Sequence, residues 1–220
     1  MKKAICLEPF EIAASLDELG LSVEILQQVV MRGTAAALSC TENHPRQAPG
    51  FYAWSETVSA LRELLIPRGW HREDDNNLPY VVNAEGTIGI IVATGDDATG
   101  RPEMEPCTNS NKGPRTADAI ALNHAQLRLF PDSSVRADDF KRANEKPGRM
   151  AWLLLIHRDP RAEEVRCELS LPSNITEDGR VGGWVRRIIL PSMPFLGPTV
   201  KITPDVPQSP PIDVKVKRRA

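Results

Sequence analysis

The chain lacks most of the features that identify a class of protein directly. Its four cysteines are scattered over 220 residues without a C-x-x-C pair, so we predict neither a disulfide framework nor a zinc site. No apolar run reaches the length of a membrane span, and glutamates interrupt the apolar residues that follow the two N-terminal lysines. We therefore expect a cytoplasmic protein with reduced thiols, no signal peptide and no membrane partner.

Recognisable catalytic patterns are also missing. The four histidines are far apart in the sequence: His44, His71, His124 and His157. No G-x-S-x-G nucleophile motif is present. The segment GDDATGRP has the glycine spacing of a phosphate-binding loop, but Arg101 and Pro102 stand where Lys and Ser or Thr are required. We expect no resident metal or cofactor.

Positive and negative charges nearly balance over the whole chain. A formal net charge of −2 argues against a protein that holds nucleic acid by bulk electrostatics. Residues 191–220 nevertheless carry +3 and the remainder −5, and the seven prolines of the same segment predict an extended tail. Four basic residues near its end are candidates for weak contacts with DNA phosphates: Lys215, Lys217, Arg218 and Arg219.

The N-terminal third reads as helical. Ser15 and Glu18 resemble a capping box, and Ser22 precedes a second helical run. Residues 51–66 place Trp54 and its apolar neighbours at helical spacing. All four tryptophans lie among apolar residues and are interpreted as core: Trp54, Trp70, Trp152 and Trp184.

From residue 70 the apolar spacing changes to that of strands. Strands at 78–83 and 87–94 predict a hairpin, and Thr116 can cap a helix that runs to about residue 130. Three later strands are expected to pair as an antiparallel meander: 150–159, 164–172 and 184–191. The fold class is therefore α+β, a single sheet and helix sandwich over residues 1–190 with helices in 1–66, followed by the Pro-rich basic tail.

The segment between the hairpin and the next helix, residues 95–116, is an unusually long loop, which predicts a functional or mobile segment. Asp96 and Asp97 begin it, and such carboxylates suit Mg²⁺, so they are candidate catalytic residues of a metal-dependent nuclease. The helix and strand order loosely resembles the restriction-endonuclease core. That family's E-x-K half-motif is missing, the nearest match being Glu164 and Arg166. Acidic turn residues are also commonly just solvated.

One pentapeptide carries most of the functional inference. Residues 126–130, QLRLF, resemble the Q-L-x-L-F peptide by which many bacterial replication and repair proteins dock on the ring-shaped sliding clamp. The resemblance implies that Gln126 is a polar anchor, that Leu129 and Phe130 fill an apolar pocket, and that Leu127 occupies the adjoining position. The alternative is core packing, because Leu127 and Phe130 fall near one face of a helix that continues through them.

The sequence thus favours a clamp-binding accessory protein of bacterial DNA replication or repair, or of a mobile-element or defence process. Its expected partner is the sliding clamp, with DNA as a second candidate partner. A second hypothesis is the nuclease with Mg²⁺, and a third is a regulatory interaction protein with no DNA role. Magnesium-dependent DNA cleavage and clamp binding separate the three.

Overall fold

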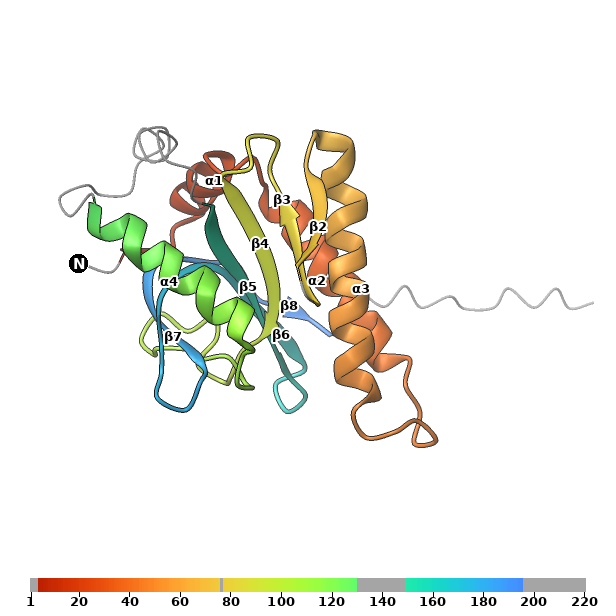
Figure 1. Ribbon diagram of the computed structural model, residues 1–220. Helices are drawn as coiled ribbons and strands as arrows, with labels where there is room; N and C mark the ends of the chain where they lie inside the picture. The colour runs from red at the N-terminus through yellow and green to blue at the C-terminus, as the bar shows by residue number, and fades with distance from the viewer. Residues whose placement is uncertain (1–3, 76, 130–148, 196–220) are drawn as a thin grey trace, which may run out of the picture.

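The computed structural model describes residues 4–75, 77–129 and 149–195, with the side chains of 124–129 left out of the description. Its centre is a mixed sheet of eight strands in the order β1-β7-β6-β5-β4-β3-β2, with β8 beside β6 (Figure 1). The strands are β1 (Ala4–Cys6), β2 (His71–Asp75), β3 (Leu78–Val82), β4 (Ile88–Thr94), β5 (Met150–Asp159), β6 (Glu164–Ile175), β7 (Val181–Ile189) and β8 (Met193–Pro194).

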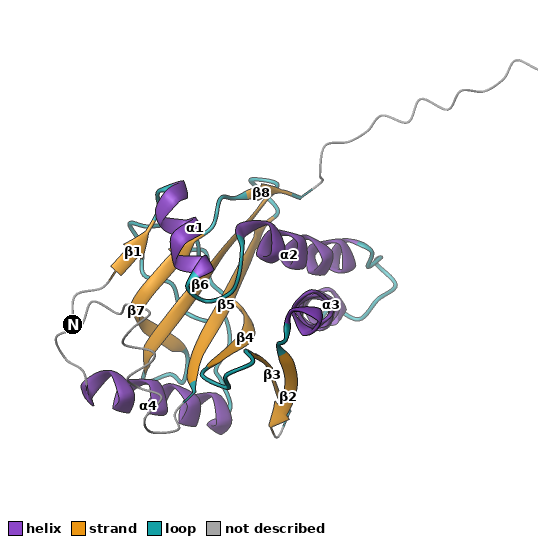
Figure 2. Ribbon diagram, turned by 90° about the horizontal axis from the view of Figure 1, so that it is seen from above, coloured by secondary structure: helices purple, strands orange, loops and turns teal. Residues whose placement is uncertain are grey.

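Helices cover both faces of the sheet. One face carries α1 (Pro9–Asp17), α2 (Val23–Leu38) and α3 (Ala48–Leu65), which continues into a 3-10 turn (Ile66–Arg68). The opposite face carries α4 (Pro114–Leu129) (Figure 2). Ser22 caps α2 as expected, since its hydroxyl accepts from the Ile25 N–H at 3.3 Å.

Each face of the sheet has its own apolar core. In β5, Trp152 and Leu154 point into the cluster under α1, α2 and α3, whereas Leu153 and Leu155 point into the cluster under α4. Successive residues of a strand face opposite sides, so a strand covered on both faces must be apolar throughout. This explains why MAWLLLI reads as one unbroken apolar run.

The predicted α+β class is confirmed, but the strand arrangement differs from the expected one. The two-stranded hairpin is a three-stranded unit, because β2 (HREDD) pairs antiparallel with β3. The sequence did not predict β2, because this strand has no apolar residue. An edge strand can be held in a sheet by backbone pairing without an apolar side chain. The hairpin and the later meander are joined by a parallel pair, β4 with β5.

The N-terminal prediction was also incomplete. β1 pairs in parallel with β7, and α1 begins at Pro9, so Ser15 lies inside the helix and is buried. Ser15 and Glu18 do not form a capping box. They bind Arg186 of β7 instead, at 2.7 and 3.1 Å.

Within the part of the chain that is described, no helix combines the length and hydropathy needed to cross a membrane. The segment assigned to the tail contributes β8, and Phe195 packs against the core cluster under α1, α2 and α3.

The contact between α2 and α3 depends on a glycine. A Cβ added at Gly33 would lie 2.6 Å from the carbonyl oxygen of Ala53 and would collide with Thr57. We expect Gly33→Ala to lower the free energy of unfolding by about 1–3 kcal/mol, because the helices must separate. Gly50→Ala is the control, since nothing lies within 4 Å there, and it should raise stability by up to about 1 kcal/mol. Urea unfolding of both variants measures this, and an equally stable Gly33→Ala protein would contradict the close packing.

Candidate functional site

The long loop after β4 is folded back on the sheet. Gly95 N donates to the Ile156 carbonyl at 3.0 Å, and Gly95 also forms a bridge with Thr108. Asn109 N donates to the Thr94 carbonyl at 2.8 Å, so the loop returns to the end of the strand that it leaves. The loop is therefore closed at its base by backbone hydrogen bonds.

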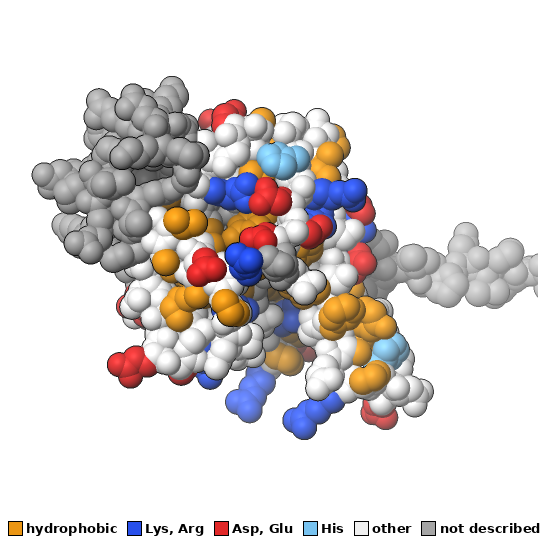
Figure 3. All heavy atoms as spheres, in the orientation of Figure 1, with side chains coloured by type: hydrophobic (Ala, Val, Ile, Leu, Met, Phe, Trp, Pro, Cys, Tyr) orange, Lys and Arg blue, Asp and Glu red, His pale blue; other side chains and the backbone are white. Residues whose placement is uncertain are grey.

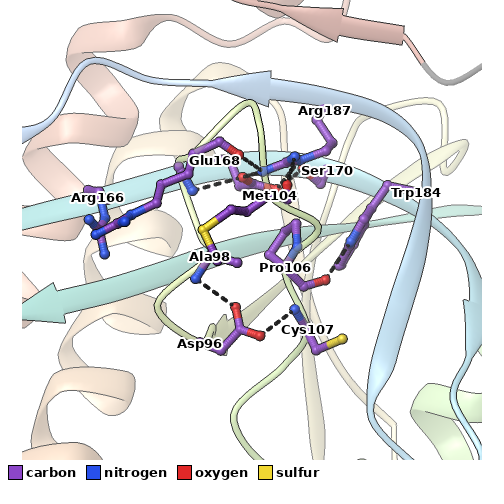
Figure 4. A network of polar contacts seen from close by, with 12 residues as sticks. Asp96, Ala98, Met104, Pro106, Cys107, Arg166, Glu168, Ser170, Trp184 and Arg187 are labelled. Carbon is purple, nitrogen blue, oxygen red and sulfur yellow. Dashed lines mark hydrogen bonds and ion pairs between the residues drawn. The ribbon is translucent and has the colours of Figure 1, made fainter.

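Asp96 fastens the two ends of this loop together. One carboxylate oxygen accepts from the Ala98 N–H at 3.2 Å and the other from the Cys107 N–H at 3.0 Å (Figure 4). The Asp96 N–H donates in turn to the Cys107 carbonyl at 2.9 Å. Asp97 is exposed, and its contact with the sheet is made by its carbonyl, which accepts from Arg166 at 3.0 Å. In this structure Asp96 organises a turn with both of its oxygens.

A buried ion pair holds the middle of the loop against β6 and β7. Glu168 and Arg187 are both fully buried, and their closest atoms are 2.6 Å apart. Arg187 also donates to the carbonyls of Met104 at 2.7 Å and Arg101 at 3.1 Å (Figure 4). Glu168 accepts from the Gly100 N–H at 2.9 Å and from a serine hydroxyl of β6 at 2.7 Å. Both charges are thereby surrounded by partners, which burial of an ion pair requires.

The residues of the nuclease hypothesis are brought together only in part. Glu164 and Arg166 lie on β6, 3.3 Å apart, and Arg166 contacts the backbone of Asp97. The described residues contain no group of three or more His, Cys, Asp or Glu side chains placed to hold a metal ion. Lys112, at the end of the loop, has its pKa lowered by burial.

The cysteine thiols are not set up as nucleophiles. All four are unpaired. Burial raises the pKa of Cys167 to about 12, and burial together with the nearby Asp96 raises the pKa of Cys107. A reactive cysteine needs the opposite shift, toward the thiolate at neutral pH.

Helix α4 is fixed to the sheet by an asparagine. The Asn123 side chain accepts from the Ala151 N–H at 2.8 Å and donates to the carbonyls of Ala151 and Pro172 at 2.9 and 3.2 Å. Ile120, one turn earlier, is buried in the cluster under α4. The asparagine therefore ties the start of β5 and the middle of β6 to the helix.

The clamp-like peptide begins after this anchor. The backbone of Gln126, Leu127 and Leu129 belongs to the last turn of α4. The side chains of these three residues lie outside the described part of the chain, as does all of Phe130. The basic residues of the tail, Lys215, Lys217, Arg218 and Arg219, lie outside it too.

One surface was missed by the sequence interpretation. Trp54 is 37% exposed, whereas the other three tryptophans are buried, so its assignment to the core was wrong. Phe51 and Tyr52 beside it are also exposed, and hydrophobic side chains gather over the N-terminal half of α3 (Figure 3). Three aromatic residues within one helical turn cannot all face one core. The spacing of Phe51, Tyr52 and Trp54 could therefore have predicted exposed aromatic side chains on this helix.

The buried ion pair predicts a strong asymmetry between substitutions. Glu168→Ala leaves the Arg187 guanidinium buried without a counter-charge and should cost about 3–5 kcal/mol of stability. Replacing both residues by methionine should cost less than the sum of the two single changes. Glu56→Ala, in the exposed pair with Arg32, is the control and should cost at most about 1 kcal/mol. Urea unfolding tests this series, and additive effects at Glu168 and Arg187 would contradict the coupling.

Comparisons with known proteins supply no relative from which a function could be transferred. No protein-family model, no curated protein and no solved structure matches the chain. The function must therefore be inferred from the residues of this chain and from the way in which the fold presents them.

Proposed function

We propose that the protein is a bacterial sliding-clamp-binding accessory protein. It acts in DNA replication or repair, or in a mobile-element or defence process tied to replicating DNA. The observation that carries the proposal is the QLRLF sequence of residues 126–130 at the outer end of α4. Gln126 is the polar anchor, and Leu129 with Phe130 are the apolar residues that enter the clamp pocket, with Leu127 beside them.

The position of the peptide in the fold supports this role. The anchoring hydrogen bonds of α4 to the sheet are made by Asn123, one turn before the peptide begins. A clamp peptide docks in an extended form, so the last turn of α4 must unwind on binding. Helix ends open at low free-energy cost, and Pro131 disfavours the helical conformation at Phe130.

The rest of the fold then acts as the body that the clamp recruits. The buried ion pair and Asp96 bind loop residues 95–107 to the sheet, so the peptide sits on a helix attached to a rigid body. In this role the protein is a partner-binding module, and the tail with Lys215, Lys217, Arg218 and Arg219 adds weak phosphate contacts when DNA passes through the ring.

Replacing Leu129 and Phe130 together by alanine tests the proposal. We expect clamp affinity to fall at least a hundredfold, because about 3–5 kcal/mol of apolar burial is lost. The melting temperature should stay unchanged. Leu122→Ala is the matched control, since Leu122 is an exposed leucine of the same helix, and it should retain clamp binding. Calorimetric titration of the purified clamp measures both. Absence of wild-type binding at tens of micromolar, or unfolding of the double variant, would show that these residues are packing groups.

A metal-dependent nuclease is the second candidate. What favours it is the contact between the acidic loop and the E-x-R pair of β6, through the Asp97 carbonyl and Arg166. Under this hypothesis Asp96→Ala abolishes Mg²⁺-dependent DNA cleavage by a chain that stays folded. Asp97→Asn is the second variant to compare. It removes the negative charge of Asp97 but keeps the contact between the Asp97 carbonyl and Arg166. A wild-type chain that neither cleaves DNA nor binds the clamp would leave a regulatory interaction protein with no DNA role.

A further inference from the structure

A groove runs along α3 beside the hairpin of β2 and β3. Its volume is about 940 Å³. One wall is a row of residues spaced four apart, namely Trp54, Val58 and Arg62 of α3 and Ile66 of the 3-10 turn that follows it. The opposite wall comes from the hairpin and includes Arg72, Asn77 and Pro79. An ion pair at 2.6 Å, Arg62 with Asp74, joins the two walls.

One aromatic residue lines the groove, and two further exposed aromatic residues lie beside it in the sequence. The lining residue is Trp54, and the rings of Phe51 and Trp54 are 6.0 Å apart. Phe51 is 60% exposed and Tyr52 is 42% exposed. Figure 3 shows this patch over the N-terminal half of α3. Large exposed aromatic side chains that adjoin a groove mark a surface that another chain segment covers.

We propose that the groove is the docking site of this chain's own Pro-rich segment, residues 204–211 (PDVPQSPP). A segment with this P-x-x-P spacing favours the polyproline II conformation, which aromatic-lined grooves recognise. Its proline rings stack on the Trp54 indole. Its backbone offers mainly carbonyl acceptors, since proline has no N–H, and the groove supplies donors in Trp54, Ser55 and Arg72.

The place where the described chain ends makes this contact accessible. Phe195 packs against the core cluster under α1, α2 and α3, and Gln27 of α2 donates to the Pro191 carbonyl at 3.5 Å. The tail therefore starts on the face of the sheet that carries α3. An extended chain covers roughly 3.1 Å per residue, so Pro204 can lie roughly 28 Å from Phe195. This reach from Phe195 to Pro204 is similar to the length of α3, which is roughly 27 Å for its 18 residues.

Charge favours contact between the tail as a whole and the body, although the segment 204–211 itself carries only Asp205. Residues 191–220 carry +3 and the rest of the chain −5, so the tail is attracted to the body that precedes it. The attraction is long-range and weakens with salt, whereas the proline contacts with Trp54 are short-range and do not. Docking in the groove is independent of the clamp peptide on α4, which lies on the opposite face of the sheet.

Quenching of tryptophan fluorescence by acrylamide tests the inference in the full chain. Trp54 is the one tryptophan that is exposed in the described body, since Trp70, Trp152 and Trp184 are at most 6% exposed. If the segment docks, Trp54 is shielded in the wild-type chain. Substituting Pro207, Pro210 and Pro211 by alanine should then raise the Stern–Volmer constant at least twofold. Pro198→Ala, a tail proline outside the segment, should leave it unchanged, and Trp54→Phe should remove the increase.

A synthetic peptide of residues 203–214 provides the second arm. Added to the triple variant, it should restore the shielding of Trp54. Equal quenching of the wild type and the triple variant would overturn the inference. So would shielding that appears only with rising protein concentration and doubled sedimenting mass, because the groove would then be covered by a second copy of the chain.

Discussion

The structure depends on the ion pair between Glu168 and Arg187, which joins the neighbouring strands β6 and β7 to the loop that follows β4. A charged pair with no solvent exposure is tolerated only when hydrogen bonds surround both partners. Here the loop itself provides those bonds, through the Gly100 N–H and the carbonyls of Arg101 and Met104. The strands cannot keep the pair without the loop, and the loop cannot keep its position without the pair.

Two consecutive arginines of β7, Arg186 and Arg187, bind different elements on the two faces of the sheet. Arg186 points to the side of α1, where it binds Ser15 and Glu18, and Arg187 points to the side of the loop. The alternation of a strand separates two neighbouring residues of the same type into two environments. One arginine fixes the N-terminal helix and the next fixes the loop after β4.

The sequence predicted a helix or strand correctly wherever its pattern of apolar residues had a single physical cause. The apolar runs of β4 and β5 and the helical spacing of 51–66 predicted those elements, because burial on defined faces dictates them. β2 could not be found, since its five residues are all polar and are held by backbone pairing with β3 and by ion pairs of Glu73 and Asp74 with arginines distant in sequence. The role of Glu168 and Arg187 could not be found either, because nothing in a single sequence pairs two charges from different strands with the carbonyls of a distant loop. Trp54 was misassigned because a tryptophan among apolar neighbours usually belongs to a core.

The pairing of β1 with β7 restricts the order in which the strands of the sheet can assemble. Ala4 lies opposite Arg186, so the first strand finds its partner only when nearly all of the described chain has been synthesised. Closing a loop of that length costs more entropy than closing a short one, and contacts so distant in sequence slow folding. During translation β1 therefore has no strand partner while the inner strands assemble. The edge of the sheet beside β7 is then completed by a strand that was synthesised before all the other strands of the sheet.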